Sequence, residues 1–158
     1  MKSNLISKSE TASIMKHISE EWKIELPKIK NLRFHHISDN EIIITGDGIT
    51  AIKIGDKILP HLSEIELLKK FPYIIVDMGA IKFVCKGANI MRPGITKLDD
   101  FNDGEIICVV EESNNKFLSV GIAKMSSDKA NSTKTGMVVE NLHYISDKFW
   151  ETKKEIKD

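Results

Sequence analysis

Two lysines, Lys82 and Lys86, have the spacing in this sequence that most clearly favours a binding function. In a helix, side chains at positions i and i+4 project from the same face, so the two ammonium groups are expected to point the same way. Their repulsion costs roughly 0.2–0.5 kcal/mol, and no acidic residue occurs in residues 78–98 to relieve it. Such a pair is suited to holding the phosphates of a nucleic acid.

The residues that follow this pair extend the predicted phosphate-binding surface. Glycines there let another backbone approach closely, with exposed amides available to phosphate oxygens. Arg92 is expected to contact a phosphate or a base edge, and Lys97 and Lys124 are secondary candidates. The full set of expected contact residues is Lys82, Lys86, Gly87, Ala88, Asn89, Arg92, Pro93, Gly94, Lys97 and Lys124.

The overall charge excludes one class of nucleic-acid-binding protein. The net formal charge of the 158-residue chain is zero, since 23 basic residues balance 23 acidic ones. Proteins that coat nucleic acid non-specifically carry a large positive excess. The charges are nevertheless segregated, because residues 78–98 hold only basic charges and residues 99–112 only acidic ones. A local basic patch is therefore compatible with the sequence, and solvated surface without a partner is the alternative interpretation.

The residues typical of metal sites and catalysis do not combine into a recognisable metal site or catalytic site. His35 and His36 are adjacent on an expected strand, so they face opposite sides and cannot share a metal ion. His143 is expected to pack or to form a hydrogen bond. Cys85 and Cys108 form no CxxC motif and are expected to be small buried apolar side chains. Glycine-rich nucleotide loops and a GxSxG motif are absent. We therefore expect no catalytic residue, no metal and no cofactor.

Local patterns predict helices and a hairpin in the first half of the chain. Apolar residues at helical spacing predict an amphipathic helix over residues 8–24, with Ser9 or Thr11 at its start. A second helix is predicted over residues 62–71, before a proline. The Gly-Asp-Gly link at residues 46–48 predicts a hairpin turn, because its residues tolerate positive φ.

The second half of the chain is expected to be a small barrel of short strands. The apolar run at residues 73–76 predicts a strand buried on both faces. A short helix over residues 79–86 is predicted to end at Gly87 as a C′ glycine, and only strands and turns are expected after it. Strands are expected at residues 29–37, 41–45, 49–54, 57–60, 73–76, 89–91, 105–111, 117–125 and 137–144.

These elements predict an α+β protein with two domains. A boundary near residue 72 gives an N-terminal domain over residues 1–72, a barrel domain over residues 73–151 and a polar tail over residues 152–158. Each domain is small, so the two are expected to pack against each other. No signal peptide and no membrane-spanning run is recognised, and a cytoplasmic monomer that does not bind membranes is expected.

The sequence resembles a known family at several motifs. The signature of the PUA domain, a small RNA-binding pseudo-barrel, is closely matched by GAIKFVCKGANIMRPGI at residues 79–95. The resemblance continues through EIICVV (105–110), SVGIAKMSS (119–127) and TGMVVENLHYISDKFW (135–150). The combination resembles the malignant T-cell-amplified sequence protein family and its archaeal relatives, together with ligatin. In that family a small N-terminal α/β domain, the pre-PUA domain, precedes the PUA domain.

The resemblance implies binding of structured RNA, with the short helix and the GANIMRPG strand forming the RNA-facing groove. Implied ligands are a tRNA acceptor arm or ribosomal RNA. The implied setting is translation initiation or ribosome recycling, with the small ribosomal subunit and an initiation-factor-like protein on another polypeptide as possible partners. The chain departs from the family in two respects. Arg92 stands where eukaryotic members tend to have a non-basic residue, and the N-terminal domain looks shorter.

The prediction is therefore a non-catalytic RNA-binding protein with a pre-PUA domain and a PUA domain. Two alternatives remain open. The first is an accessory subunit of an RNA-modifying enzyme, since PUA domains are often appended to such catalysts. The second is a scaffold that binds only other proteins.

Overall fold

The computed structural model describes residues 1–157, which divide into two compact units. The N-terminal unit comprises Met1–Glu64, and the C-terminal unit begins at Ile65. The structure thus divides the chain after Glu64, whereas the sequence places a domain boundary near residue 72. No helix among residues 1–157 combines the length and the apolar character needed to span a membrane.

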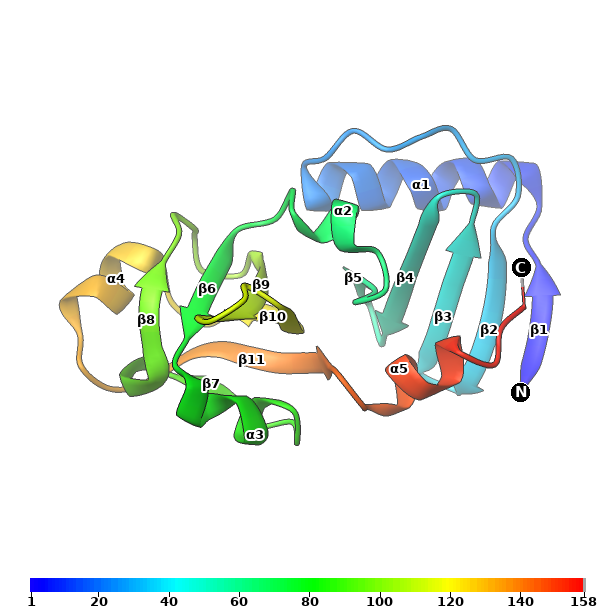
Figure 1. Ribbon diagram of the computed structural model, residues 1–158. Coiled ribbons are helices and arrows are strands. Elements are labelled where there is room, and N and C mark those ends of the chain that lie inside the picture. Colours follow the sequence, from blue (N-terminus) through cyan, green and yellow to red (C-terminus); the bar gives the residue numbers. More distant parts are fainter. Residues whose placement is uncertain (158) are drawn as a thin grey trace. The chain divides into compact units, whose positions relative to one another are not determined.

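The N-terminal unit is a five-stranded antiparallel sheet with one long helix (Figure 1). The strands lie in chain order, and each pairs with the next. The elements are β1 (Lys2–Leu5), α1 (Lys8–Trp22), β2 (Arg33–Ser38), β3 (Glu41–Gly46), β4 (Ile49–Ile54) and β5 (Lys57–Pro60).

A side-chain cap begins helix α1, and a residue in the left-handed conformation ends it. The Ser7 side chain accepts a hydrogen bond from the Glu10 backbone N–H, so the helix begins earlier than the expected caps Ser9 and Thr11 would place it. It ends at Trp22 rather than at residue 24, because Lys23 adopts a left-handed conformation with φ 57°. The indole N–H of Trp22 donates to the Ile58 carbonyl, which ties the end of the helix to β5.

The predicted hairpin is confirmed, and an edge strand was missed. Gly46 pairs with Ile49, and Gly48 has φ 77° in the turn between β3 and β4. Strand β1 is the edge strand that the sequence did not predict, because all four of its residues are exposed. A strand without a buried face lacks the apolar alternation by which strands are recognised.

The C-terminal unit is a six-stranded, nearly closed pseudo-barrel in the order β7-β11-β10-β9-β6-β8. Its α+β character, together with the N-terminal sheet, confirms the predicted fold class. The elements are α2 (Ile65–Leu68), β6 (Tyr73–Val76), η1 (Met78–Ala80), α3 (Ile81–Val84), β7 (Ile90–Met91), η2 (Arg92–Gly94), β8 (Ile95–Leu98), β9 (Ile106–Glu111), β10 (Phe117–Ala123), α4 (Ser127–Ser132), β11 (Met137–Tyr144) and α5 (Lys148–Lys153).

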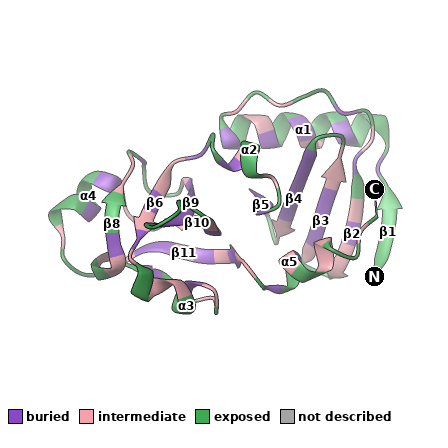
Figure 2. Cartoon of the chain, in the orientation of Figure 1, coloured by how far each residue is buried: buried purple, intermediate pink, exposed green. Residues whose placement is uncertain are grey.

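The barrel encloses an apolar core, which Figure 2 shows as the buried parts of its strands. Ile74 and Val76 of β6 are fully buried in this core, together with Ile107 and Val109 of β9. Tyr73 and Ile75 are only half-buried, so β6 alternates between an inner and an outer face. The expectation that this strand is buried on both faces is therefore wrong.

Two short helices occur where only strands and turns were expected. Helix α4 begins after Ser126, whose side chain accepts from the Lys129 backbone N–H. Helix α5 begins after Asp147, which accepts from the Trp150 backbone N–H. Both helices have six residues, and only caps of this kind mark such short elements in a sequence.

Candidate nucleic-acid interface

The η1–α3 segment starts at an acidic end. The Asp77 carboxylate accepts a hydrogen bond from the Ala80 backbone N–H at 3.0 Å. The Glu112 carboxylate accepts from the Met78 backbone N–H at 3.1 Å. These two carboxylates satisfy backbone donors at the start of the segment, where anions are favoured. A phosphate is therefore not expected at this end.

Helix α3 ends in the conformation that the sequence predicted. The Ala88 N–H donates to the Phe83 carbonyl and the Gly87 N–H donates to the Val84 carbonyl, which together form a Schellman motif. Gly87 has φ 94°, as a C′ glycine requires. A Cβ at this position would also lie 3.0 Å from the Tyr144 ring. The Gly87 and Ala88 amides are thus occupied within the chain, contrary to the expectation that they are free for phosphate oxygens.

Two lysines and three apolar side chains are exposed beside this helix, and we call them the α3 surface. They are Met78, Lys82, Phe83, Lys86 and Met91. Lys82 and Lys86 have no carboxylate within ion-pair distance among residues 1–157. Lys86 lies just beyond α3, with its N–H donating to the Phe83 carbonyl.

Phe83 lies on this surface although helical spacing groups it with the apolar Ala80 and Val84. Its side chain is 56% exposed, whereas Val84 is 3% exposed. The Lys82 ammonium lies 5.1 Å from the centroid of the Phe83 ring, within cation–π range. The face that packs on the core comprises Ala80, Ile81, Val84 and Cys85.

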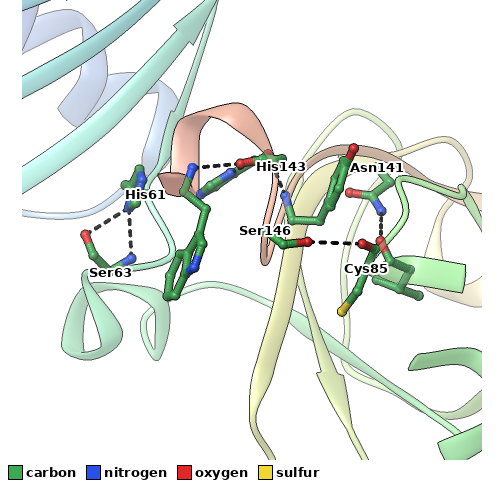
Figure 3. Close-up of polar contacts among 10 residues, drawn as sticks. His61, Ser63, Cys85, Asn141, His143 and Ser146 are labelled. Carbon is green, nitrogen blue, oxygen red and sulfur yellow. Dashed lines mark hydrogen bonds and ion pairs between the residues drawn. The ribbon is translucent and has the colours of Figure 1, made fainter. Parts of the chain in front are cut away.

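Residues on and just after β11 hold the end of α3 in place (Figure 3). The Asn141 side-chain amide donates to the carbonyls of Val84 and Ala88 at 3.1 and 3.0 Å. The Ser146 hydroxyl donates to the Cys85 carbonyl at 3.4 Å. Orphan carbonyls at a helix end need such partners. The sequence analysis did not identify Asn141 or Ser146, since neither belongs to a local binding motif.

A β-bulge sets the position of Asn141. The pairing of β10 with β11 shifts between Val120 and Gly121, so that Gly121 lies opposite Asn141. A Cβ on Gly121 would overlap the Glu140 carbonyl oxygen, so only glycine allows this approach of the two strands. The bulge changes which residues of β11 face the barrel and therefore aims the Asn141 amide at α3.

A buried hydrogen bond between His143 and Asp147 fixes the turn that follows β11. The His143 Nδ1 and the Asp147 Oδ2 are 2.8 Å apart, and both side chains are buried. Asp147 also accepts from the backbone N–H groups of Tyr144 and Trp150. Burial raises the pKa of Asp147, but the His143 hydrogen bond and charge, with the two backbone donors, outweigh it and lower the pKa below its usual value. The prediction that His143 packs or forms a hydrogen bond is confirmed.

Arg92 does not project freely toward a ligand. Its Nε donates to the Ala130 carbonyl, and an Nη donates to the Ile95 carbonyl at 3.2 Å. The guanidinium thus joins η2, β8 and α4. Pro93, between β7 and β8, is exposed, and the Gly94 carbonyl accepts from the Asp77 backbone N–H. Asn89, just before β7, accepts from the Asn141 backbone N–H.

The two secondary candidates lie apart from the α3 surface. The Lys97 ammonium lies over the Tyr73 ring, 5.6 Å from its centroid, on the outer face of the barrel. Lys124 forms an ion pair with Glu140 at 3.8 Å. The structure therefore brings together Lys82 and Lys86, and places the other predicted basic residues in different surroundings.

The histidines and cysteines have structural partners. His35 bonds to Ser3 and Thr45, and His36 bonds to Asn4. His61 bonds to Ser63 within the N-terminal unit (Figure 3).

Cys108 is fully buried, and burial raises the pKa of its thiol. Cys85 is only half-buried. In the described part of the chain, no cluster of three or more histidine, cysteine, aspartate or glutamate side chains is able to hold a metal ion.

The pseudo-barrel, with a short helix at its edge and a sheet domain before it, defines the chain as a PUA-domain protein. The PUA domain family matches residues 72–145. The chain is 37% identical over 132 residues to an uncharacterized protein of Methanocaldococcus jannaschii, covering 81% of this chain and 80% of that protein. It is 39% identical over 143 residues to malignant T-cell-amplified sequence 1-A of Xenopus laevis, covering 85% and 78%.

The chain belongs to the family of malignant T-cell-amplified sequence proteins. A crystal structure of a hypothetical protein from Pyrococcus horikoshii has a similar fold, with a TM-score of 0.79 and 25% identity. That match covers 96% of this chain and 99% of the other. The PUA domain itself suggests RNA binding.

Proposed function

We propose that this protein is a non-catalytic binder of structured RNA that uses the α3 surface of its PUA domain. The observation that carries the proposal is the pair of exposed ammonium groups, Lys82 and Lys86, which have no carboxylate partner among residues 1–157. Unpaired surface lysines keep their full charge available for phosphates. The pair flanks Phe83 in sequence, and this ring is available for stacking on a base.

The expected binding is weak and depends on salt. Two phosphate contacts give a log–log slope of affinity against salt of about −2. This is shallower than four contacts would give, because Arg92 and Lys124 have other partners. RNA helices are recognised mostly by shape and backbone, so specificity is expected to come from the geometry of a stem end. A tRNA acceptor arm or a ribosomal RNA stem has such an end.

The cellular setting that we propose is translation. Family membership and the PUA domain support this setting. The small ribosomal subunit and an initiation-factor-like protein on another polypeptide are the corresponding partners. Their involvement is tested by co-sedimentation of the purified protein with small ribosomal subunits.

A second candidate function rests on the apolar part of the α3 surface. Met78 and Met91 are each 48% exposed, and Phe83 is 56% exposed. Exposed large apolar side chains that gather at one place often mark a protein interface. A protein-interaction scaffold therefore competes with RNA binding for the same residues, and the experiment below separates the two.

The test is a double charge reversal, Lys82→Glu with Lys86→Glu, assayed by binding to a tRNA and to an unstructured RNA of equal length. The control, Lys28→Glu with Lys30→Glu, makes the same change in net charge at exposed residues of the N-terminal unit. We expect the first variant to lose tRNA binding at 100 mM salt and the control to retain it, with both melting temperatures nearly unchanged. Equal tRNA binding by both variants would contradict the proposal.

A single substitution, Phe83→Ala, distinguishes the two candidate functions. If the surface binds RNA, this variant retains the salt dependence of tRNA binding and loses affinity about fivefold or more, because a stacked base is worth about 1–3 kcal/mol. If the surface binds only protein, tRNA affinity is absent in the wild-type protein and unaffected by this change.

A further inference from the structure

A second concave site lies on the outer face of the barrel, on the C-terminal unit alone. It encloses about 330 Å³, which is at the lower end of the usual range of small-molecule pockets, about 300–1,000 Å³. Leu68 and Phe71, on and just after α2, form part of its wall. None of the expected phosphate-binding residues except Lys97 lines it.

Its floor is a row of side chains across four neighbouring strands. Phe117 of β10 pairs with Val110 of β9, Val110 pairs with Ile75 of β6, and Ile75 pairs with Lys97 of β8. Directly opposite residues in neighbouring strands point to the same face. The row therefore runs from an aromatic ring through two aliphatic side chains to an ammonium group. It spans about 14 Å for three strand spacings.

Tyr73 adds a second ring to this row. It precedes Ile75 by two residues on β6 and so shares its face. The Lys97 ammonium lies 5.6 Å from the centroid of the Tyr73 ring. Both Tyr73 and Phe117 are half-buried, so each ring keeps part of its surface open to a ligand.

A hydrogen-bonded turn at residues 111–116 forms the polar side of the site. The Glu111 carboxylate accepts hydrogen bonds from the Ser113 hydroxyl and from the backbone N–H groups of Asn114 and Lys116. These bonds also lower the pKa of Glu111, the Asn114 N–H contributing most. Asn115, at φ 55° in this turn, is exposed and lines the site, and its side chain carries an amide that is able to form hydrogen bonds.

The charges at the rim are positive. Lys69 and Lys97 line the site, and both are exposed. Lys69 also forms an exposed ion pair with Glu66 at 3.2 Å. Within residues 1–157, Lys97 has no carboxylate at ion-pair distance, and its ammonium lies over the Tyr73 ring. An anionic group is therefore attracted to the Lys97 end of the row.

We infer that this site binds a nucleotide, with the base on the aromatic row and the phosphate at Lys97 and Lys69. Bases stack on aromatic side chains, an amide reads a base edge, and lysines hold phosphate. The same chemistry is presented by a free mononucleotide and by an unpaired residue of an RNA chain. The two rings and the amide favour a base over an aliphatic peptide side chain. This site is separate from the α3 surface, so the inference does not depend on the proposed function.

The experiment is a titration of the full-length protein with AMP and with a six-residue oligoadenylate RNA. Binding is followed by NMR of the Ile75 methyl groups and the Tyr73 ring. We expect shifts at these residues with at least one of the two ligands. Shifts with AMP identify a site for free nucleotides, and shifts with the oligomer alone identify a site for an RNA chain.

Substitutions of Tyr73 and Lys97 test whether the ligand binds at this site and not elsewhere on the protein. Tyr73→Leu removes the ring and keeps an apolar side chain, so affinity is expected to fall about fivefold or more, and Tyr73→Phe is expected to restore it. Lys97→Gln is expected to weaken binding and to reduce the salt slope of oligomer binding by about 0.7. The matched control Phe34→Leu removes a half-buried ring from β2 of the N-terminal unit and is expected to leave both unchanged.

Three outcomes would overturn the inference. The first is the absence of shifts with either ligand at millimolar concentration. The second is an equal response of the Tyr73→Leu variant and the wild type. The third is tighter binding of an apolar peptide with a free carboxyl terminus, in competition with AMP. The Lys82→Glu, Lys86→Glu variant is expected to bind AMP normally, so failure of the RNA proposal leaves this test intact.

Discussion

Asn141→Ala tests the idea that β11 positions the α3 surface. The wild-type amide donates two hydrogen bonds, at 3.1 and 3.0 Å, to the carbonyls of Val84 and Ala88. Each such bond contributes about 1 kcal/mol, so the substitution removes about 2 kcal/mol from the local structure. For a protein of this size, a loss of that magnitude lowers the melting temperature by roughly 4–8 °C.

The local effect is measured by amide hydrogen exchange. The N–H groups of Gly87 and Ala88 donate to the carbonyls of Val84 and Phe83, and these bonds break when the end of α3 opens. A loss of about 2 kcal/mol corresponds to an increase of about 30-fold in the opening equilibrium. We expect exchange of these two amides to accelerate by that factor, with little change in the central strand β9. The affinity for tRNA is expected to fall as well, because the ammonium groups lose their fixed positions.

The control for this prediction is Asn131→Ala, which removes an exposed asparagine from α4. This variant is expected to match the wild type in stability, exchange and RNA binding. The reasoning would be refuted if Asn141→Ala and Asn131→Ala had the same exchange rates at Gly87 and Ala88. A global loss of stability without faster exchange at α3 would also be contrary to it.

Two further predictions concern residues that the structure assigns to stability. The pKa of Asp147 is lowered in the folded protein, so its contribution is present above the unfolded value of about 3.9 and is lost as the pH falls through the folded value. Urea unfolding of Asp147→Asn between pH 6 and pH 3 is therefore expected to show a flatter pH dependence than the wild type, and parallel curves would contradict this. Arg92→Lys keeps the charge but loses the fork that bonds Ala130 and Ile95, so urea unfolding is expected to show a loss of about 1–2 kcal/mol. An unchanged midpoint would argue against a structural role for Arg92.

Local signals in the sequence were sufficient for several elements that position the site. The β3–β4 hairpin and the C′ role of Gly87 follow from glycine conformations that neighbours in the chain determine. Strand β11 was predicted with its observed bounds, Met137–Tyr144, and its buried Val138 and Val139 are of the β-branched type that favours strands. The exposed pair Lys82 and Lys86 was also found from sequence, since an acid-free window is visible without a structure.

The errors arose where a partner lies far away in the sequence. No local signal indicates the bond of Arg92 to Ala130, because that acceptor is 38 residues away; its contact with a phosphate or a base edge stays a prediction. A helical wheel groups Phe83 with Val84, whereas the packing of α3 on the barrel covers the face with Ile81 and Val84 and leaves Phe83 exposed. A wheel gives the faces of a helix but not which face is covered, and tertiary contacts decide this.

The capping of α3 bears on what its lysines are for. Cations near a helix C-terminus often stabilise the unpaired carbonyls there, and this role is the alternative explanation for Lys82 and Lys86. The carbonyls of Phe83 and Val84 are already satisfied by backbone donors and by Asn141. Lys82 also contacts the Phe83 ring, but the two like charges repel each other, which is unfavourable for folding. A repulsive pair that is not needed to cap its helix is best explained by an anionic partner, and a structured RNA supplies the phosphates that would relieve it.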